Sequence, residues 1–210
     1  MSDYSAALDY AEAHRTRYRT IVIDPPWPQK GGGTLQGREG WHDARGASMP
    51  LRYDLMTVDE IAALPIREIA DPTGAHLYLW TTNGFLPTAF DVLRSWGFTY
   101  STTLVWAKTP MGGGLGGAFG ISTEYVLFAR RGVVREEERR PRVRGTWWNW
   151  KRPYDERGKP KGSAKPREFY DVVEQASPGP YLEMFARSKR EGWDAWGRQA
   201  PDAVDLSVIE

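Results

Sequence analysis

A chain of 210 residues with 40% hydrophobic and 13% aromatic residues is long and apolar enough to build one sizeable core. This composition excludes an intrinsically disordered chain, and we expect a single domain over residues 1–210. The formal net charge is only +1, so any basic surface must be local. The chain has no cysteine, which excludes disulfides and a cysteine-ligated zinc site, and no apolar run that could span a bilayer. We therefore expect a cytoplasmic protein with no metal.

Hydrophobic periodicity predicts an alternation of helices and strands, which is typical of an α/β fold with a mostly parallel sheet. In chain order, the predicted elements are a helix near Tyr4–Tyr18, a strand at Ile21–Ile23, a short helix from Thr57 to Pro65, a strand at Ala75–Thr81, a helix at Phe85–Trp96, strands at Phe98–Trp106 and Thr123–Ala129, a helix opened by Lys165 and Pro166, and a strand at Tyr181–Ala186. Glycine-rich or charged segments near 29–50, 109–120 and 135–166 predict flexible loops.

Local signals predict where several of these elements begin and end. Thr57 and Glu60 have the spacing of a capping box, which opens a helix. Gly97 is a predicted C-terminal cap, and Pro166 suits the first position of the helix that it opens.

The segment Ile21–Trp27 reads Ile-Val-Ile-Asp-Pro-Pro-Trp. A β-branched run that ends in an acid predicts a buried strand that carries Asp24 to its carboxyl end, where open α/β sheets bind ligands. Pro25 and Pro26 stiffen the turn and remove two donors, so we expect it to offer only acceptors: the Asp24 carboxylate and the carbonyls of Asp24 and Pro25. Trp27 adds a flat face. The alternative is an ordinary strand and turn, but rigid acceptors beside an aromatic ring suit the exocyclic amine of adenine.

Such an amine is a poor nucleophile because its lone pair is delocalised into the ring. Acceptors that bind its N–H groups return electron density to the nitrogen, and the alkylated amine then loses its proton to water without a strong base. None of the three histidines, His14, His42 and His76, is adjacent to the motif, which disfavours a Ser-His-Asp mechanism. The sequence therefore favours group transfer to an amine, catalysed by positioning and electrostatics.

Further motifs follow Asp24–Trp27 in a fixed order, and together with it they resemble one known family. They are Arg52–Thr57, Leu77–Thr82, Leu104–Thr109, a glycine-rich stretch with Glu124, Ser163–Pro166, Leu182–Arg187 and Gly192–Gln199. Over Arg19–Gln199 the chain resembles the MT-A-seventy-like adenine-N6 methyltransferases, a family that includes the catalytic subunit of the eukaryotic messenger-RNA methyltransferase and bacterial and phage members.

The resemblance implies S-adenosylmethionine as the methyl donor and a Rossmann-like sheet in permuted order, with the catalytic strand first and the cofactor strand near the C-terminus. The absence of Gly-x-Gly-x-x-Gly after the first strand agrees with this order. By resemblance, Asp24, Pro25, Pro26 and Trp27 are the catalytic residues, and Asp24 would hold both the methionine ammonium and the target amine. The residues that would bind the cofactor are Asp24, Lys165 at the methionine carboxylate, Glu183, Arg187 at the ribose, Arg198, and Gln199 at the adenosine. For Glu183 the alternative is a structural pair with a neighbouring arginine.

A basic segment predicts a nucleic-acid partner. Residues 135–166 contain eleven Lys or Arg against five Asp or Glu, together with Trp147, Trp148 and Trp150. Basic residues interleaved with aromatic ones are typical of surfaces that bind phosphates and unstacked bases, although a solvated loop and core-anchoring tryptophans are the alternatives. The candidate substrate-binding residues are Tyr53 and Trp27 around the base, and Trp147, Trp148, Arg142 and Arg144 along the strand.

We expect the substrate to be DNA rather than RNA, because the compact chain has no obvious RNA-binding appendage. A base inside a duplex would have to be flipped out, unless the substrate is single-stranded. Two alternatives stay open: an RNA adenosine-N6 methyltransferase, and a catalytically silent scaffold that binds nucleic acid. The sequence leaves open whether the protein forms a homo-oligomer or has a partner subunit.

Overall fold

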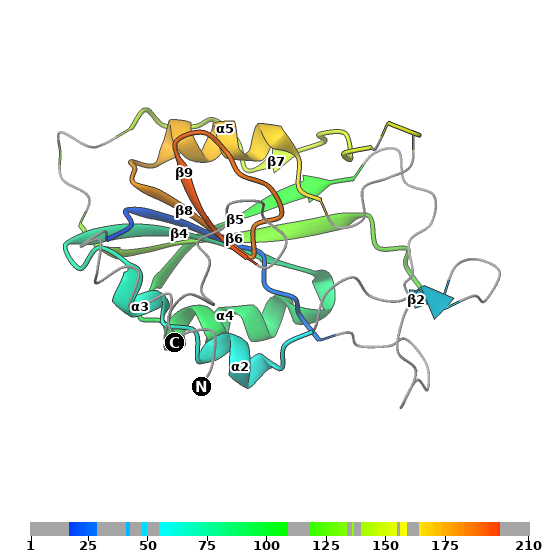
Figure 1. The fold of residues 1–210 in the computed structure, drawn as a ribbon, viewed down its shortest axis with the longest axis horizontal. Helices are drawn as coiled ribbons and strands as arrows, with labels where there is room; N and C mark the ends of the chain where they lie inside the picture. Colours follow the sequence, from blue (N-terminus) through cyan, green and yellow to red (C-terminus); the bar gives the residue numbers. More distant parts are fainter. Residues whose placement is uncertain are drawn as a thin grey trace.

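The computed structural model describes residues 17–28, 41–42, 48–49, 55–108, 118–133, 136, 140–154, 156–158 and 164–197. Its centre is a seven-stranded sheet in the order β7-β5-β6-β4-β1-β8-β9 (Figure 1). The strands are β1 (Thr20–Ile23), β4 (Gly74–Thr81), β5 (Thr99–Ala107), β6 (Thr123–Gly132), β7 (Trp147–Trp148), β8 (Tyr181–Met184) and β9 (Trp193–Trp196). β6 runs antiparallel to both of its neighbours, and the other pairs are parallel. Two short strands, β2 (Trp41–His42) and β3 (Ser48–Met49), form a separate antiparallel pair.

Helices cover both faces of the sheet, as Figure 1 shows. On one face lie α2 (Val58–Ala62), α3 (Ile66–Ile69), the short 3-10 helix η1 (Asn83–Phe85) and α4 (Leu86–Ser95); on the other lies α5 (Arg167–Ala176). Each face has its own hydrophobic core. The predicted α/β class with a mostly parallel sheet is therefore confirmed, and it has the Rossmann-like, permuted arrangement that we expected.

The central strands are buried along their whole length, which explains why they read as continuous apolar runs. Every residue of β1 and β4 is buried, because each strand lies between two neighbours and under helices on both faces. β1 pairs with β4 on one side and with β8 on the other. The first strand of the sheet and a strand near the C-terminus thus lie side by side at its centre.

Several local predictions are confirmed by backbone geometry. Thr57 and Glu60 form the capping box: the Glu60 N–H donates to Thr57 Oγ1 at 3.2 Å, and the Thr57 N–H donates to Glu60 Oε2 at 2.7 Å. Gly97 ends α4 with φ of +77°, a left-handed conformation that glycine adopts without steric cost. Both signals are local, so they hold whatever the tertiary structure.

Several predicted boundaries are wrong. The helix predicted to stop at Pro65 ends at Ala62, and the strand predicted to end at Ala129 continues to Gly132. Tyr18, the expected last residue of a helix near Tyr4–Tyr18, instead forms a parallel β-bridge with Ala70, and residues 4–16 lie outside the described ranges. Pro166 is the N-cap of α5 rather than its first residue, because its ψ of 141° is extended. The strand predicted to reach Ala186 ends at Met184, because Phe185 has φ of +61° and turns the chain out of the sheet.

Most of the segments predicted as flexible loops near 29–50, 109–120 and 135–166 are outside the described ranges or only partly described. Where they are described, they contain the β2–β3 pair and the edge strand β7. No helix in the described ranges combines the length and apolar character needed to cross a membrane.

Candidate active site

Asp24 emerges at the centre of the sheet, directly after β1. From β1 the chain first builds strands on the β4 side, and only later adds β8 and β9 on the other side. The carboxyl ends of parallel strands beside such a reversal form the crevice in which open α/β sheets bind ligands. Asp24 therefore lies where the sequence predicted, at the ligand-binding edge.

The turn after Asp24 is held by backbone hydrogen bonds. The Trp27 N–H donates to the Pro25 carbonyl at 2.8 Å, and the Met56 N–H donates to the Pro26 carbonyl at 3.0 Å. We expected the Pro25 carbonyl to be available to a ligand, but it accepts a hydrogen bond within the turn itself. A carbonyl oxygen has two lone pairs, so the Pro25 carbonyl keeps one acceptor site, and its use by a ligand stays a prediction together with that of the Asp24 carboxylate and carbonyl.

Trp27 does not present an open aromatic face. Its side chain is buried, with 8% of the residue exposed, and its ring stacks on Phe85 with centroids 5.4 Å apart. Its indole N–H donates to the Trp80 carbonyl at 2.9 Å. In this structure Trp27 ties the Asp-Pro-Pro turn to β4 and η1, so its contact with a base stays a prediction.

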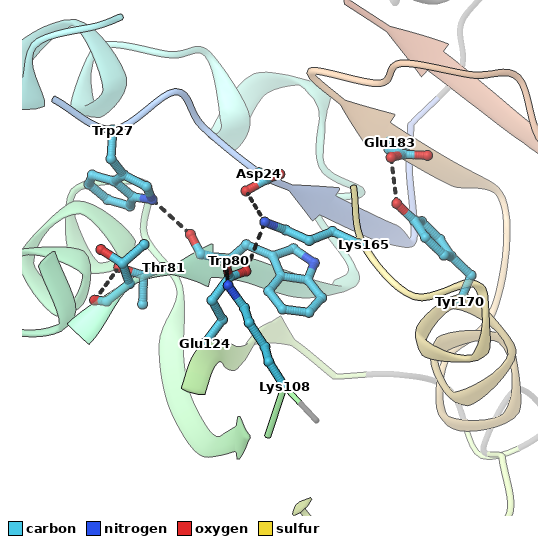
Figure 2. Close-up of polar contacts among 10 residues, drawn as sticks. Asp24, Trp27, Trp80, Thr81, Lys108, Glu124, Lys165, Tyr170 and Glu183 are labelled. Atoms are coloured by element: carbon cyan, nitrogen blue, oxygen red, sulfur yellow. Dashed lines mark hydrogen bonds and ion pairs between the residues drawn. The ribbon is translucent and has the colours of Figure 1, made fainter. Parts of the chain in front are cut away.

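Four charged side chains from distant parts of the chain meet at this edge (Figure 2). Lys165 Nζ lies 3.0 Å from Asp24 Oδ1 and 3.1 Å from Glu124 Oε2. Glu124, at the start of β6, also accepts a hydrogen bond on Oε1 from Lys108, which follows β5. With all four ionised, the cluster of Asp24, Lys165, Glu124 and Lys108 is electrically neutral.

Burial acts differently on the members of this cluster. It raises the pKa of the Asp24 carboxyl above its usual range, although the Lys165 ammonium lowers it in part. Burial would also raise the pKa of Glu124, but attraction to Lys165 and Lys108 lowers it below its usual range. Burial opposes the charge of Lys165, yet Asp24 and Glu124 hold its pKa above the usual value. Asp24 is therefore the acid whose negative charge is least compensated, and a cation or an N–H donor would stabilise it.

Tryptophan rings line the same cluster. Lys165 Nζ lies 4.8 Å from the centroid of Trp80, and Lys108 Nζ lies 5.2 Å from that of Trp106. The two rings meet edge to face, with centroids 6.0 Å apart. The indole N–H of Trp80 is buried and has no hydrogen-bond partner among the described residues. A buried indole N–H is a donor only, so this group fits a ligand that carries an acceptor oxygen.

Glu183 lies on β8 beside Val22 of β1. Its Oε1 accepts a hydrogen bond of 2.5 Å from the Tyr170 hydroxyl of α5. Burial raises the pKa of the Glu183 carboxyl, although the Tyr170 hydrogen bond lowers it in part. Its hydrogen-bond donor is thus a tyrosine, and Arg190 and Arg187 also favour its negative charge, so the alternative of a pair with an arginine stays open. Glu183 is a second, half-buried acid close to Asp24.

The structure brings part of the predicted site together. The predicted residues Asp24, Lys165 and Glu183 lie at one edge of the sheet, with Arg187 just beyond β8. Tyr53, Arg198 and Gln199 lie outside the described residues.

The predicted nucleic-acid residues lie on the segment that carries β7. Arg142 and Arg144 are both exposed. Trp147 is 58% exposed, whereas Trp148 is half-buried and stacks on Trp150 with centroids 4.9 Å apart.

This segment is attached to the wall of the charged cluster. Trp148 is paired in register with Trp106 of β5. The Trp106 indole N–H donates to the Trp150 carbonyl at 2.9 Å. The exposed Trp147 therefore stands on the sheet edge beside the strand that ends at the cluster, which is compatible with a nucleic-acid strand there.

Sequence reasoning assigned no role to Lys108, Glu124, Trp80 or Trp106. All four belong to the ordered motifs, and Glu124 is an acid directly before the apolar run Tyr125–Ala129. A carboxylate beside such a run is a usable signal, because buried acids need a partner. Its partners, however, come from other strands, and their identity cannot be read from the sequence.

Comparison with known proteins agrees with this geometry. Residues 18–199 match the MT-A70 family. The chain is similar to the Type II methyltransferase M.MunI of a Mycoplasma species, with 29% identity over 92% of this chain and 82% of that protein. It is similar to the N6-methyladenosine RNA methyltransferase MTA1 of Cryphonectria parasitica, with 27% identity over 92% of this chain and 54% of that protein. The human N(6)-adenosine-methyltransferase catalytic subunit METTL3 is 22% identical over 90% of this chain and 29% of that protein. The chain thus spans most of M.MunI but about half or less of the other two.

Proposed function

Since the chain belongs to the MT-A70 family of methyltransferases, we propose that it transfers a methyl group from S-adenosylmethionine to the N6 amine of adenine in DNA. The observation that carries this proposal is the position of Asp24. It is a half-buried acid with a raised pKa, held at the carboxyl end of β1 at 3.0 Å from a lysine whose side chain is 10% exposed. Such a carboxylate is suited to accept hydrogen bonds from an amine, because N–H donors stabilise its ionised form.

The described residues fit the methyl donor. When bound, S-adenosylmethionine supplies a methyl group on a sulfonium cation, beside an ammonium and a carboxylate. Asp24 and Glu183 are two half-buried acids whose pKa values are raised, so a cationic ligand compensates both. Lys165 has three N–H donors, of which two point to Asp24 and Glu124, and we assign the third to the methionine carboxylate. The unpartnered Trp80 N–H is a further donor for an acceptor oxygen.

Other donor contacts are proposed from the family resemblance. We place Arg187 at the ribose and Gln199 at the adenosine. Arg198 stands where the family usually has Asn, and we place it at a ribose hydroxyl. Arg187 follows the end of β8 by three residues, so it lies at the same edge of the sheet as Glu183.

For the acceptor, the Asp24 carboxylate and carbonyl receive hydrogen bonds from the N6 amine and raise the electron density on its nitrogen. Pro25, Pro26 and the buried Trp27 keep these acceptors rigid, which is the source of electrostatic preorganisation. Glu124 has a lowered pKa and is therefore a weak base. This agrees with a mechanism in which the methylated amine releases its proton to water. We propose Tyr53 as the residue that stacks on the base.

The choice of DNA rests on the extent of the matches. The similarity to the Type II methyltransferase M.MunI covers most of both proteins. The similarity to the RNA methyltransferase MTA1 covers only about half of MTA1. We propose that the strand follows the segment around β7, with Trp147 and Trp148 against bases and Arg142 and Arg144 at phosphates.

The proposal is tested by methylation with a deuterium-labelled donor. The purified protein is incubated with S-adenosylmethionine carrying a trideuteromethyl group and with single-stranded DNA, duplex DNA and RNA of one sequence. Nucleosides are then analysed by mass spectrometry. We expect labelled N6-methyldeoxyadenosine, with a rate at least about a hundred-fold lower in Asp24→Ala. The isosteric Asp24→Asn serves as a control for packing.

Each other outcome overturns a stated part of the proposal. Labelled N6-methyladenosine in RNA, with none in DNA, would show that the substrate is RNA rather than DNA. Binding of nucleic acid without any methylation or affinity for the donor would identify a silent scaffold instead. Activity of Asp24→Ala equal to that of the wild type would exclude the mechanism.

A further inference from the structure

The segment around α5 contacts two acids on adjacent strands. Lys165, two residues before α5, reaches Asp24 at the end of β1. Tyr170, within α5, donates to Glu183 on β8 at 2.5 Å. Because β1 and β8 are paired, these two contacts connect one rigid helix to both acids of the proposed donor site (Figure 2). The contact of Lys165 is part of that site, whereas Tyr170 has no assigned role.

Tyr170 is fixed on all sides. The guanidinium carbon of Arg190 lies 3.9 Å from the centroid of its ring, in the geometry of a cation–π contact. Its ring also meets those of Phe169 and Trp193 edge to face, at 5.3 Å and 5.4 Å. Burial raises the pKa of the Tyr170 hydroxyl well above its usual value, so the hydroxyl remains a donor at any physiological pH.

Arg190 is chemically unusual in this position. Its Nε is buried and has no hydrogen-bond partner among the described residues. A cation over the face of a phenol attracts its electrons and strengthens the O–H as a donor. The three side chains are therefore linked in one chain of contacts: the Arg190 cation lies over the Tyr170 ring, and the Tyr170 hydroxyl donates to the Glu183 carboxylate.

We propose that Tyr170 is a positioning residue for the methyl donor. Its hydroxyl, strengthened as a donor by the Arg190 cation over the ring, holds the Glu183 carboxylate ionised and oriented toward the donor. This inference rests on the proposed function, because it needs a cationic donor at Glu183. It goes beyond that function by assigning a role to two residues that do not themselves touch the donor.

The charged and titratable groups around Glu183 determine what removal of the hydroxyl does. Asp24 disfavours its negative charge, whereas Arg190 and Arg187 favour it, and the Tyr170 hydrogen bond adds to their effect. In Tyr170→Phe the burial of Glu183 is less compensated, so its carboxyl takes up a proton at higher pH. A neutral Glu183 binds a cation less well, so affinity for the donor should begin to fall at a higher pH than in the wild type.

The test is calorimetric binding of S-adenosylmethionine between pH 5.5 and 8.5. At neutral pH we expect Tyr170→Phe to bind about tenfold more weakly, as is typical when a hydrogen bond to a charged group is removed. We also expect the pH at which its affinity is half-maximal to shift upward. The control is Tyr181→Phe, which removes a hydroxyl that donates to the Ser177 carbonyl at 2.8 Å and should leave the profile unchanged.

A double-mutant cycle isolates the hydrogen bond between Tyr170 and Glu183. In a Glu183→Gln background, Tyr170→Phe should cause no further pH shift, because the carboxyl whose titration the Tyr170 hydroxyl affects is absent. A pH profile of Tyr170→Phe identical to that of the wild type overturns the inference, even if the affinity falls. If the wild type itself fails to bind S-adenosylmethionine, the proposed function is wrong, which is a distinct result.

A second variant covers the case in which Tyr170→Phe does not fold, as judged by thermal unfolding. Arg190→Met keeps the hydroxyl and removes the cation over the ring. It should shift the pH of half-maximal binding in the same direction, by less than removal of the hydroxyl does. If the pH of half-maximal binding does not shift in Arg190→Met, the proposed contribution of Arg190 to the Tyr170 hydrogen bond is excluded.

Discussion

Replacing Lys165 by methionine should destabilise the protein strongly, and more at alkaline than at acidic pH. The ammonium lies between two carboxylates, 3.0 Å from Asp24 and 3.1 Å from Glu124. The side chains are 10%, 24% and 12% exposed, so solvent screens these charges little. Methionine keeps the apolar stem against Trp80 but removes the cation between the two acids, which leaves Lys108 beside Glu124 and the weaker attraction of Arg187 on Asp24.

The magnitude follows from the cost of an uncompensated buried charge. Removal of one partner of a buried ion pair costs about 3–5 kcal/mol. Lys108 still pairs with Glu124, so the charge left without a partner is that of Asp24, and we expect about 3 kcal/mol. The pKa of Asp24 is already raised by burial and should rise further in the variant. Between its unfolded and folded pKa values the folded state then binds the extra proton, so the deficit relative to the wild type should shrink as the pH falls from 8 to 5.

Urea unfolding of Lys165→Met at pH 8, 7 and 5 measures this deficit. The exposed Lys151→Met is the matched control and should change the free energy of unfolding by no more than about 0.5 kcal/mol. Lys165→Met combined with Asp24→Asn should recover much of the stability, because it removes the unpaired charge. A deficit that is small at pH 8, or that grows as the pH falls, would refute the electrostatic account of the cluster.

Four other predictions concern separate parts of the molecule. Burial lowers the pKa of His76 to about 4 from an unfolded value near 6.5. The protein should therefore lose stability, by about 3 kcal/mol at most, as the pH falls from 6.5 to 4. The free energy of unfolding of His76→Gln should lack this dependence on pH. Trp147→Ala should weaken binding of single strands by about 1–3 kcal/mol without lowering the melting temperature, whereas Trp148→Ala should lower it, because its ring packs on Trp150. Arg187→Ala should weaken calorimetric binding of S-adenosylmethionine by about 1.5–3 kcal/mol; unchanged affinity would remove it from the donor site. Neutralising Arg140, Arg142 and Arg144 together should lower the slope of log affinity against log salt by about 0.7–0.9 for each phosphate that these arginines bind in the wild type, and an unchanged slope would make the basic segment a solvated loop.

Local features of the chain could be predicted from the sequence, because they depend only on neighbouring residues. The capping box at Thr57, the left-handed Gly97 and the burial of β1 follow from side chains and backbone limits within a few positions. The order of motifs likewise predicted the family and the permuted sheet. Even the position of Asp24 was predictable, since a buried parallel strand must deliver the next residue to the ligand-binding edge.

The boundaries of strands and helices and the exposure of side chains were harder to predict from the sequence, because they depend on what packs against each residue. The strand that begins at Tyr181 stops at Met184 where Phe185 turns out of the sheet. Trp27, expected to offer a flat face beside the acceptors, is buried because Phe85 and the Trp80 carbonyl lie against it. The edge strand β9 escaped prediction because its four residues show no periodicity distinct from a loop.

The sequence by itself determined the chemistry at the end of β1: an acid, two prolines and a tryptophan after a strand that must be buried. Only the tertiary structure decided which charges surround that acid. Lys108, Glu124 and Lys165 are far apart in the sequence. They form one cluster with Asp24 because β6 runs antiparallel between β5 and β4, and because the residues before α5 reach the carboxyl end of β1. Strand order and direction are global properties, set by which packing buries the most apolar surface. No local pattern contains them, so the partners of a buried charge become known only when the sheet is assembled.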